Sequence, residues 1–197
     1  MGDIKSAFER AMERADKLGK ATPEEMERLQ YIPEGEKLAA KFLRNECLLG
    51  EELDQHEEKV RGLVAKGAHG VFLSNIALPK NEHIQRTSEK SMEGLKALKR
   101  DGAALDKIFS KITNIFEHYL QQGMTQRQEA FEALKKDFQA KLEQAMRQQG
   151  AGVPPGARTD VESQPQFQEA WRKVMAQMDS QYLNVLSDYK QEIVNIL

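Results

Sequence analysis

The stretch WRKVMAQMDSQYLNVLSDYKQEIVNIL, residues 171–197, carries the clearest structural pattern in the chain. Apolar side chains recur here in steps of three and four residues, as on a helix face that packs against another helix. Glu192 takes the one rung that is not apolar, and Ile193 lies beside it. We call the apolar rungs the C-terminal ladder: Trp171, Met175, Met178, Tyr182, Val185, Tyr189 and Ile196.

The ladder is a candidate core seam or a candidate interface. It can pack on another helix of the same chain, or it can meet a second copy of itself. We favour packing within the chain and also expect dimerisation through a helical face. The sequence does not separate the two, because an obligate interface resembles a protein core.

The composition predicts an all-α fold. Of the 197 residues, 40% are hydrophobic, 30% are charged and 7% are aromatic, and only six are proline. This balance is typical of long two-faced helices. We expect about six to eight helices, arranged as an antiparallel bundle or a long helical hairpin with an N-terminal cap of shorter helices.

Net charge, hydropathy and cysteine content limit the cellular compartments and the classes of partner that we expect. The net charge of −2 gives no general attraction to nucleic acid or to anionic membranes. No apolar run has the length of a membrane span, and no signal-peptide core is visible. Cys47 is the only cysteine, so no intrachain disulfide can form. We therefore expect a cytoplasmic protein that binds neither nucleic acid nor membrane.

Residues 1–80 are expected to form a subdomain of short helices. Asp3 begins a helix with an apolar face from Ile4 to Leu18. Thr22, Pro23 and Glu25 form a capping box that starts the next helix. Pro33 and Gly35 are expected to interrupt it before a helix that ends near Asn45, and residues 51–66 are expected to form one further helix.

Residues 67–81, GAHGVFLSNIALPKN, are the most apolar stretch. Periodicity alone permits a short buried strand or a short buried helix. We favour a helix over 71–78, because Phe72 and Ile76 are one turn apart and no second strand is near. Asn81 is expected to cap the element that follows.

Residues 81–149 are expected to form long helices with two breaks. The first is at Asp101 and Gly102, and the second is at 123–125, where Gly123 can end one helix and Thr125 can cap the next. The second break permits either a helical hairpin or one long kinked helix. Residues 150–158, GAGVPPGAR, are expected to be a flexible linker before a C-terminal helix in 159–197 that packs back on the bundle or on a partner.

The sequence contains no recognisable metal, cofactor or catalytic motif, and we assign no such residue. A ferritin-like site needs Glu-x-x-His, and no histidine here has a carboxylate three residues before it. Glu52 and His56 share a helix face, but the acidic residues around them indicate a solvated surface. A site assembled from residues distant in sequence stays open as an alternative, with the candidates Cys47, His69, Asn75, His83 and His118.

Two small basic groups define a second alternative, a regulatory module with weak nucleic-acid contact. One is Lys96, Lys99 and Arg100, and the other is Lys135 with Lys136. Both are flanked by acidic residues and lack nearby aromatic residues, so ordinary solvated helix faces explain them.

The opening GDIKSAFERAMERADK, the segment NIALPKNE and the terminal helix together resemble an uncharacterised family of small, cytoplasmic, bacterial helical proteins. The resemblance implies an all-α fold and no activity. The extended amphipathic faces and the absence of catalytic motifs lead us to expect a non-enzymatic helical interaction or scaffold protein that self-associates.

Overall fold

The computed structural model describes residues 22–98, 102–148 and 160–196, and every regular element within these ranges is an α-helix. The predicted all-α fold is confirmed. The helix predicted to begin at Asp3 and the linker predicted at 150–158 lie outside the described residues.

The chain divides into two compact units. Unit 1 comprises Met1–Ser74 and Glu93–Leu98, and unit 2 comprises Asn75–Met92 and Lys99–Leu197. The division thus falls at residue 74 rather than at the expected residue 80, and a short later segment joins the first unit.

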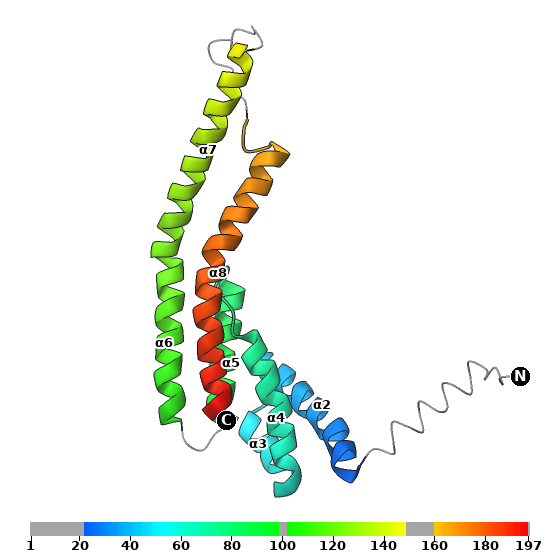
Figure 1. Cartoon of the computed structure of the whole chain (residues 1–197). Coiled ribbons are helices and arrows are strands. Elements are labelled where there is room, and N and C mark those ends of the chain that lie inside the picture. The colour runs from blue at the N-terminus through cyan, green and yellow to red at the C-terminus, as the bar shows by residue number, and fades with distance from the viewer. Residues whose placement is uncertain (1–21, 99–101, 149–159, 197) are drawn as a thin grey trace, which may run out of the picture. The chain divides into compact units, whose positions relative to one another are not determined.

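Unit 1 contains α2 (Pro23–Leu43), α3 (Leu49–Asp54), α4 (Glu58–Asn75) and the end of α5 (Glu82–Leu98) (Figure 1). The predicted capping box is confirmed: the Glu25 amide donates to Thr22 Oγ1 at 3.2 Å, and the Thr22 amide donates to Glu25 Oε2 at 2.7 Å. The predicted end of a helix near Asn45 is also confirmed, because α2 ends at Leu43 and Asn45 has a φ of 59°.

The predicted interruption at Pro33 and Gly35 is wrong, because α2 runs through both residues. Gly35 serves the packing of α2 on α4 instead. A Cβ at Gly35 would lie 1.9 Å from the Val64 carbonyl oxygen, and one at Gly67 would lie 2.0 Å from the Ile32 carbonyl oxygen. The two backbones therefore cross at a distance that only glycine permits at these positions.

The single helix predicted over 51–66 is also wrong, since α3 ends at Asp54 and α4 begins at Glu58. One continuous helix would place Asp54 one turn from Glu57 and Glu58, and like charges at that spacing repel. In the observed arrangement the Glu57 carbonyl accepts the Val60 and Arg61 amides, both at 2.9 Å.

Phe72 of α4 lies at the centre of the unit 1 core. Its ring is fully buried and meets Phe42 of α2 edge-on, with 5.5 Å between the ring centroids. Gly94 of α5 leaves room for the same ring, because a Cβ there would lie 2.6–2.8 Å from it. The remaining buried apolar side chains of the unit include Leu38, Leu49, Leu53, Val64 and Leu95.

Unit 2 begins with the end of the apolar stretch. The helix favoured over 71–78 reaches only Asn75, and Ile76 and Leu78 are buried without helical structure. Buried Ser88 of α5 supports this non-helical backbone, because its Oγ accepts the Ala77 amide at 3.0 Å. The predicted cap is confirmed: the Ile84 amide donates to Asn81 Oδ1 at 2.9 Å.

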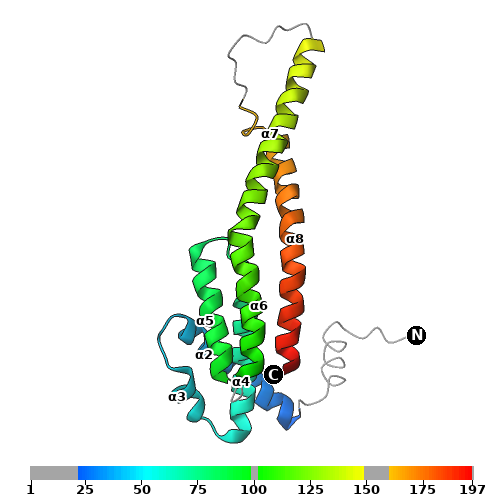
Figure 2. The same cartoon turned by 90° about the vertical axis from the view of Figure 1, so that its left-hand side faces the viewer.

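The rest of unit 2 is built from α6 (Ala103–Leu120), α7 (Gln122–Gln148) and α8 (Pro165–Ile196). The predicted break is confirmed at Gly102, which is not helical and directly precedes α6, whereas Asp101 lies outside the described residues. The second break lies at Gln121, and α7 continues in the direction of α6 (Figures 1 and 2). No hairpin forms at 123–125, because the Gln121 amide still bonds to the Glu117 carbonyl and the Thr125 amide to the Gln121 carbonyl.

α8 runs antiparallel along both α7 and α6 (Figure 2). Near its start, Phe167 meets Phe138 and Trp171 meets Phe131, with ring centroids 5.4 and 5.1 Å apart. Near its end, Glu192 meets Lys111 of α6. Within the described part of the chain, none of the helices combines the length and apolar character that crossing a membrane requires.

Candidate functional site

The C-terminal ladder lies along one edge of the buried face of α8. The buried α8 side chains are Phe167, Asp179, Leu186 and Ile193. Six of the seven ladder side chains are half-buried, and Val185 is 41% exposed. The ladder therefore touches the neighbouring helices with one side and presents its other side to solvent.

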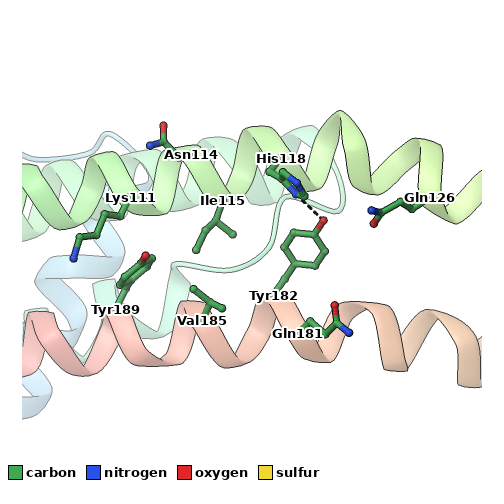
Figure 3. A pocket seen from close by; sticks show the side chains of 9 residues that line it. All are labelled: Lys111, Asn114, Ile115, His118, Gln126, Gln181, Tyr182, Val185 and Tyr189. Carbon is green, nitrogen blue, oxygen red and sulfur yellow. Dashed lines mark hydrogen bonds between the residues drawn. The ribbon is translucent and has the colours of Figure 1, made fainter.

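A groove follows the part of this edge from Gln181 to Tyr189, between α6 and α8, and Gln126 of α7 also lines it. We call it the α6/α8 groove; its volume is about 480 Å³, and it is lined by Lys111, Asn114, Ile115, His118, Gln126, Gln181, Tyr182, Val185 and Tyr189. Figure 3 shows Ile115 pointing toward Val185 between the two helices. The groove exists because consecutive turns of two antiparallel helices leave one side of their seam uncovered.

The polar groups of the groove lie at its sides. His118 Nδ1 is 2.9 Å from the Tyr182 hydroxyl (Figure 3). Lys111 Nζ lies 5.1 Å from the centroid of the Tyr189 ring and 3.3 Å from Glu192 Oε2. Such an arrangement, with an apolar centre and a polar margin, resembles the anatomy of a protein–protein interface.

A buried polar cluster adjoins the Tyr182 end of the groove. Asp179 is 6% exposed and accepts a 3.0 Å hydrogen bond from the Tyr119 hydroxyl. Its other carboxylate oxygen is 2.6 Å from Lys80 Nζ. Burial raises the pKa of Tyr119, and the hydrogen bond to Asp179 raises it further. Through Asp179, the cluster therefore connects α8 to Lys80 and to Tyr119 of α6.

Arg127 of α7 completes this cluster. Its guanidinium carbon lies 4.3 Å from the centroid of the Tyr119 ring, and Nη2 donates to the Tyr119 carbonyl at 3.1 Å. Gly123 gives the side chain room, because a Cβ there would lie 3.0 Å from Arg127 Nη1 and 3.2 Å from the Tyr182 hydroxyl. Sequence reasoning missed the cluster, since its members are far apart in the chain and Asp179 lies next to a ladder rung.

The five candidates for a site distant in sequence fall in different units. Cys47 and His69 belong to unit 1, whereas Asn75, His83 and His118 belong to unit 2. Of the five, His118 lines the α6/α8 groove, and His83 is exposed. Among the described residues, no three His, Cys, Asp or Glu side chains are placed to hold a metal ion.

Cys47 is not activated as a nucleophile. Its thiol is half-buried, and its sulfur is 3.9 Å from the Leu38 carbonyl oxygen. Burial raises the pKa of the thiol, and the charge of Glu52 adds to this effect. A raised pKa lowers the thiolate fraction, which is the reactive form.

Glu52 and His56 share a second hollow, within unit 1. Its volume is about 340 Å³, and Glu34, Lys37 and Lys41 of α2 also line it. The acidic residues around the pair, Glu51, Asp54, Glu57 and Glu58, are exposed. The mixture of charges leaves this hollow without the uniform anionic character of a cation site.

The structure describes one member of the first basic group and both members of the second. Lys96 is exposed, and Lys99 and Arg100 lie outside the described residues. Lys135 forms an ion pair with Glu162, whereas Lys136 is exposed.

The fold and the groove define an all-α protein in which a long helix returns along a kinked pair of helices and leaves an uncovered apolar edge. The chain belongs to a family of unknown function, DUF6657, whose model matches residues 50–195. No curated protein and no solved structure matches the chain. The resemblance to an uncharacterised family is confirmed, and the match spans α4 to α8 and most of α3.

Proposed function

We propose that this chain is a non-enzymatic helical interaction or scaffold protein, and that the α6/α8 groove is the surface through which it binds. The observation that carries the proposal is the position of the C-terminal ladder. Seven large apolar side chains at helical spacing are half-buried or exposed along one edge of α8.

A helix is the partner element that fits such a surface. Amphipathic helices bind in apolar grooves through anchors spaced three and four residues apart. The ladder has that spacing, and Ile115 adds an apolar contact from α6. A helix that packs over the seam would bury the remaining exposed apolar area. Burial of apolar surface is the main driving force of association.

The surroundings of the groove favour binding over chemistry. Lys111 is held by Glu192, and the Tyr182 hydroxyl is held by His118. Each of these polar groups therefore has an ionic or hydrogen-bonding partner within the chain, at the margin of an apolar surface. We further propose that the protein self-associates and that it acts in the cytoplasm, where its lone cysteine stays reduced.

Photo-crosslinking in living cells tests the proposal. A benzophenone amino acid is placed at Val185 in the groove or, as a matched control, at exposed Asn184 on the adjacent position of α8. Illumination should produce a protein adduct from position 185 and not from position 184, and mass spectrometry should identify the adduct as a second copy or as another protein. Equal yields at the two positions, or no adduct at 185, would refute the proposal.

A further inference from the structure

We infer that the occupant of the α6/α8 groove is a second copy of this chain, docked so that the two α8 helices run antiparallel about a two-fold axis between Tyr182 and Val185. This inference rests on the proposed function and names the partner of the same surface.

The spacing of the ladder is symmetric. From Trp171 to Ile196, with Glu192 included, the steps are four, three, four, three, four, three and four residues. They read the same in both directions, so a two-fold axis at the midpoint superimposes the rungs of one α8 on the rungs of the other. A two-fold interface needs this kind of self-complementary surface.

The axis pairs each rung with a rung of the second copy. Tyr182 meets Val185 of the second copy, Met178 meets Tyr189, and Trp171 meets Ile196. Met175 meets Glu192, whose carboxylate is at the edge of the groove beside Lys111. A shifted axis would leave rungs at one end of the ladder without a counterpart, so this alignment covers the most apolar surface.

The charges of the groove permit a second copy to approach. A surface of one sign would repel its own copy, because an isologous interface places like charges together. Here the cationic Lys111 is 3.3 Å from the carboxylate of Glu192. The other polar lining groups include Asn114, Gln126 and Gln181, whose amides both donate and accept hydrogen bonds.

The outline of the seam along the whole ladder is large enough for a stable dimer. The ladder spans 25 helical steps, or about 38 Å at 1.5 Å per residue. The face of two packed helices is about 20 Å wide, from their separation and diameter. Their product is about 760 Å² per copy, close to the roughly 800 Å² per partner that a standard-sized interface buries.

Light scattering on the full chain tests the inference. We expect a mass twice that of the 22.4 kDa chain at micromolar concentration. Val185→Glu should weaken the dimer at least about 100-fold, because each of two copies then places a charge in the apolar seam. Since Val185 is 41% exposed, the glutamate stays solvated in the monomer and the circular dichroism should not change. Asn184→Glu, at the neighbouring exposed position, should leave the dimer intact.

Cysteine crosslinking tests the antiparallel alignment. In a Cys47→Ser background, Val185→Cys places two thiols near the axis, so a short bis-maleimide should join two chains. Ile196→Cys places them at opposite ends of the seam, about 38 Å apart by helix geometry, so no crosslink should form. A pair of variants, Trp171→Cys and Ile196→Cys, mixed together should crosslink to each other.

Each outcome has a defined meaning. A monomer at all concentrations overturns the inference and the proposed self-association, whereas binding of another protein through the groove is still decided by the cellular crosslinking result. A dimer that tolerates Val185→Glu, or one in which Ile196→Cys joins to itself, also overturns it. A second protein identified at position 185 in cells, with no adduct to a copy of the chain, supports the proposed function and overturns the second copy as occupant.

Discussion

Replacing Gly67 by alanine should destabilise unit 1, although the same replacement nearby should stabilise it. A Cβ at Gly67 would lie 2.0 Å from the Ile32 carbonyl oxygen and 3.2 Å from the Glu36 amide nitrogen. Both atoms belong to the backbone of α2, so no side chain can turn away to make room. The helices must separate by about 1 Å to reach a tolerable contact, and the dispersion contacts around the crossing weaken as they do.

Two opposing effects determine how much Gly67→Ala changes the free energy of unfolding. Overpacking of a tight site costs about 1–3 kcal/mol, and a backbone neighbour places this crossing at the upper end. Alanine in place of glycine inside a helix returns about 1 kcal/mol. We expect a net loss of about 2 kcal/mol in the free energy of unfolding.

Gly70 provides the matched control. It lies in the same helix, is exposed, and a Cβ there would meet nothing within 4 Å. Gly70→Ala should therefore stabilise unit 1 by up to about 1 kcal/mol. Urea unfolding followed by circular dichroism gives the free energies, and hydrogen exchange of the α2 and α4 amides locates the effect.

A double variant adds a second test of the reasoning. Gly35→Ala should be similarly destabilising, since its Cβ would lie 1.9 Å from the Val64 carbonyl oxygen. The loss in Gly35→Ala with Gly67→Ala should be smaller than the sum of the single losses, because one separation of the helices relieves both clashes. Equal effects of Gly67→Ala and Gly70→Ala would refute the argument for a backbone crossing.

Three further predictions concern buried polar groups. The pKa of Tyr119 is raised in the folded state, so its contribution to stability is full below the unfolded pKa of about 10 and is lost as the pH rises through the folded pKa. Tyr119→Phe should therefore reduce the loss of thermal stability at alkaline pH. An unchanged dependence of the melting temperature on pH would contradict this role of Tyr119. Ser88→Ala should cost about 1–3 kcal/mol by leaving the Ala77 amide without its acceptor, whereas Ser110→Ala, an exposed hydroxyl, should change urea stability by less than about 0.5 kcal/mol. Cys47 should react with iodoacetamide more slowly in the folded chain than in urea, because burial raises its thiol pKa; equal rates would argue against that burial.

The sequence predicted best what depends on neighbouring residues. The caps at Thr22 and Asn81 are local hydrogen bonds, and both form as expected. The helical character of α5, α6 and α7 likewise follows from the periodicity of the sequence. Pro33 and Gly35 were misread for a related reason: local rules treat both as breakers, but α2 gains a close crossing with α4 at Gly35 that no local rule contains.

The site was visible only in part. The ladder spacing is a pattern in one helix, so the rungs could be named from the sequence. Which side of α8 is buried depends on α6 and α7, and the structure buries Asp179 and Leu186, one residue after the rungs Met178 and Val185. A carboxylate is a poor candidate for a buried position until its partner Tyr119, sixty residues earlier, is known.

Asp179 also determines how far α8 can slide. A heptad repeat by itself is nearly degenerate: moving α8 by seven residues places most of the apolar rungs where other apolar rungs were. Such a slip would carry Asp179 away from the Tyr119 hydroxyl, and a buried carboxylate without a donor is costly. Buried Asp179 thus selects one register from several that the apolar side chains would accept, much as a polar residue at a core position does in a coiled coil.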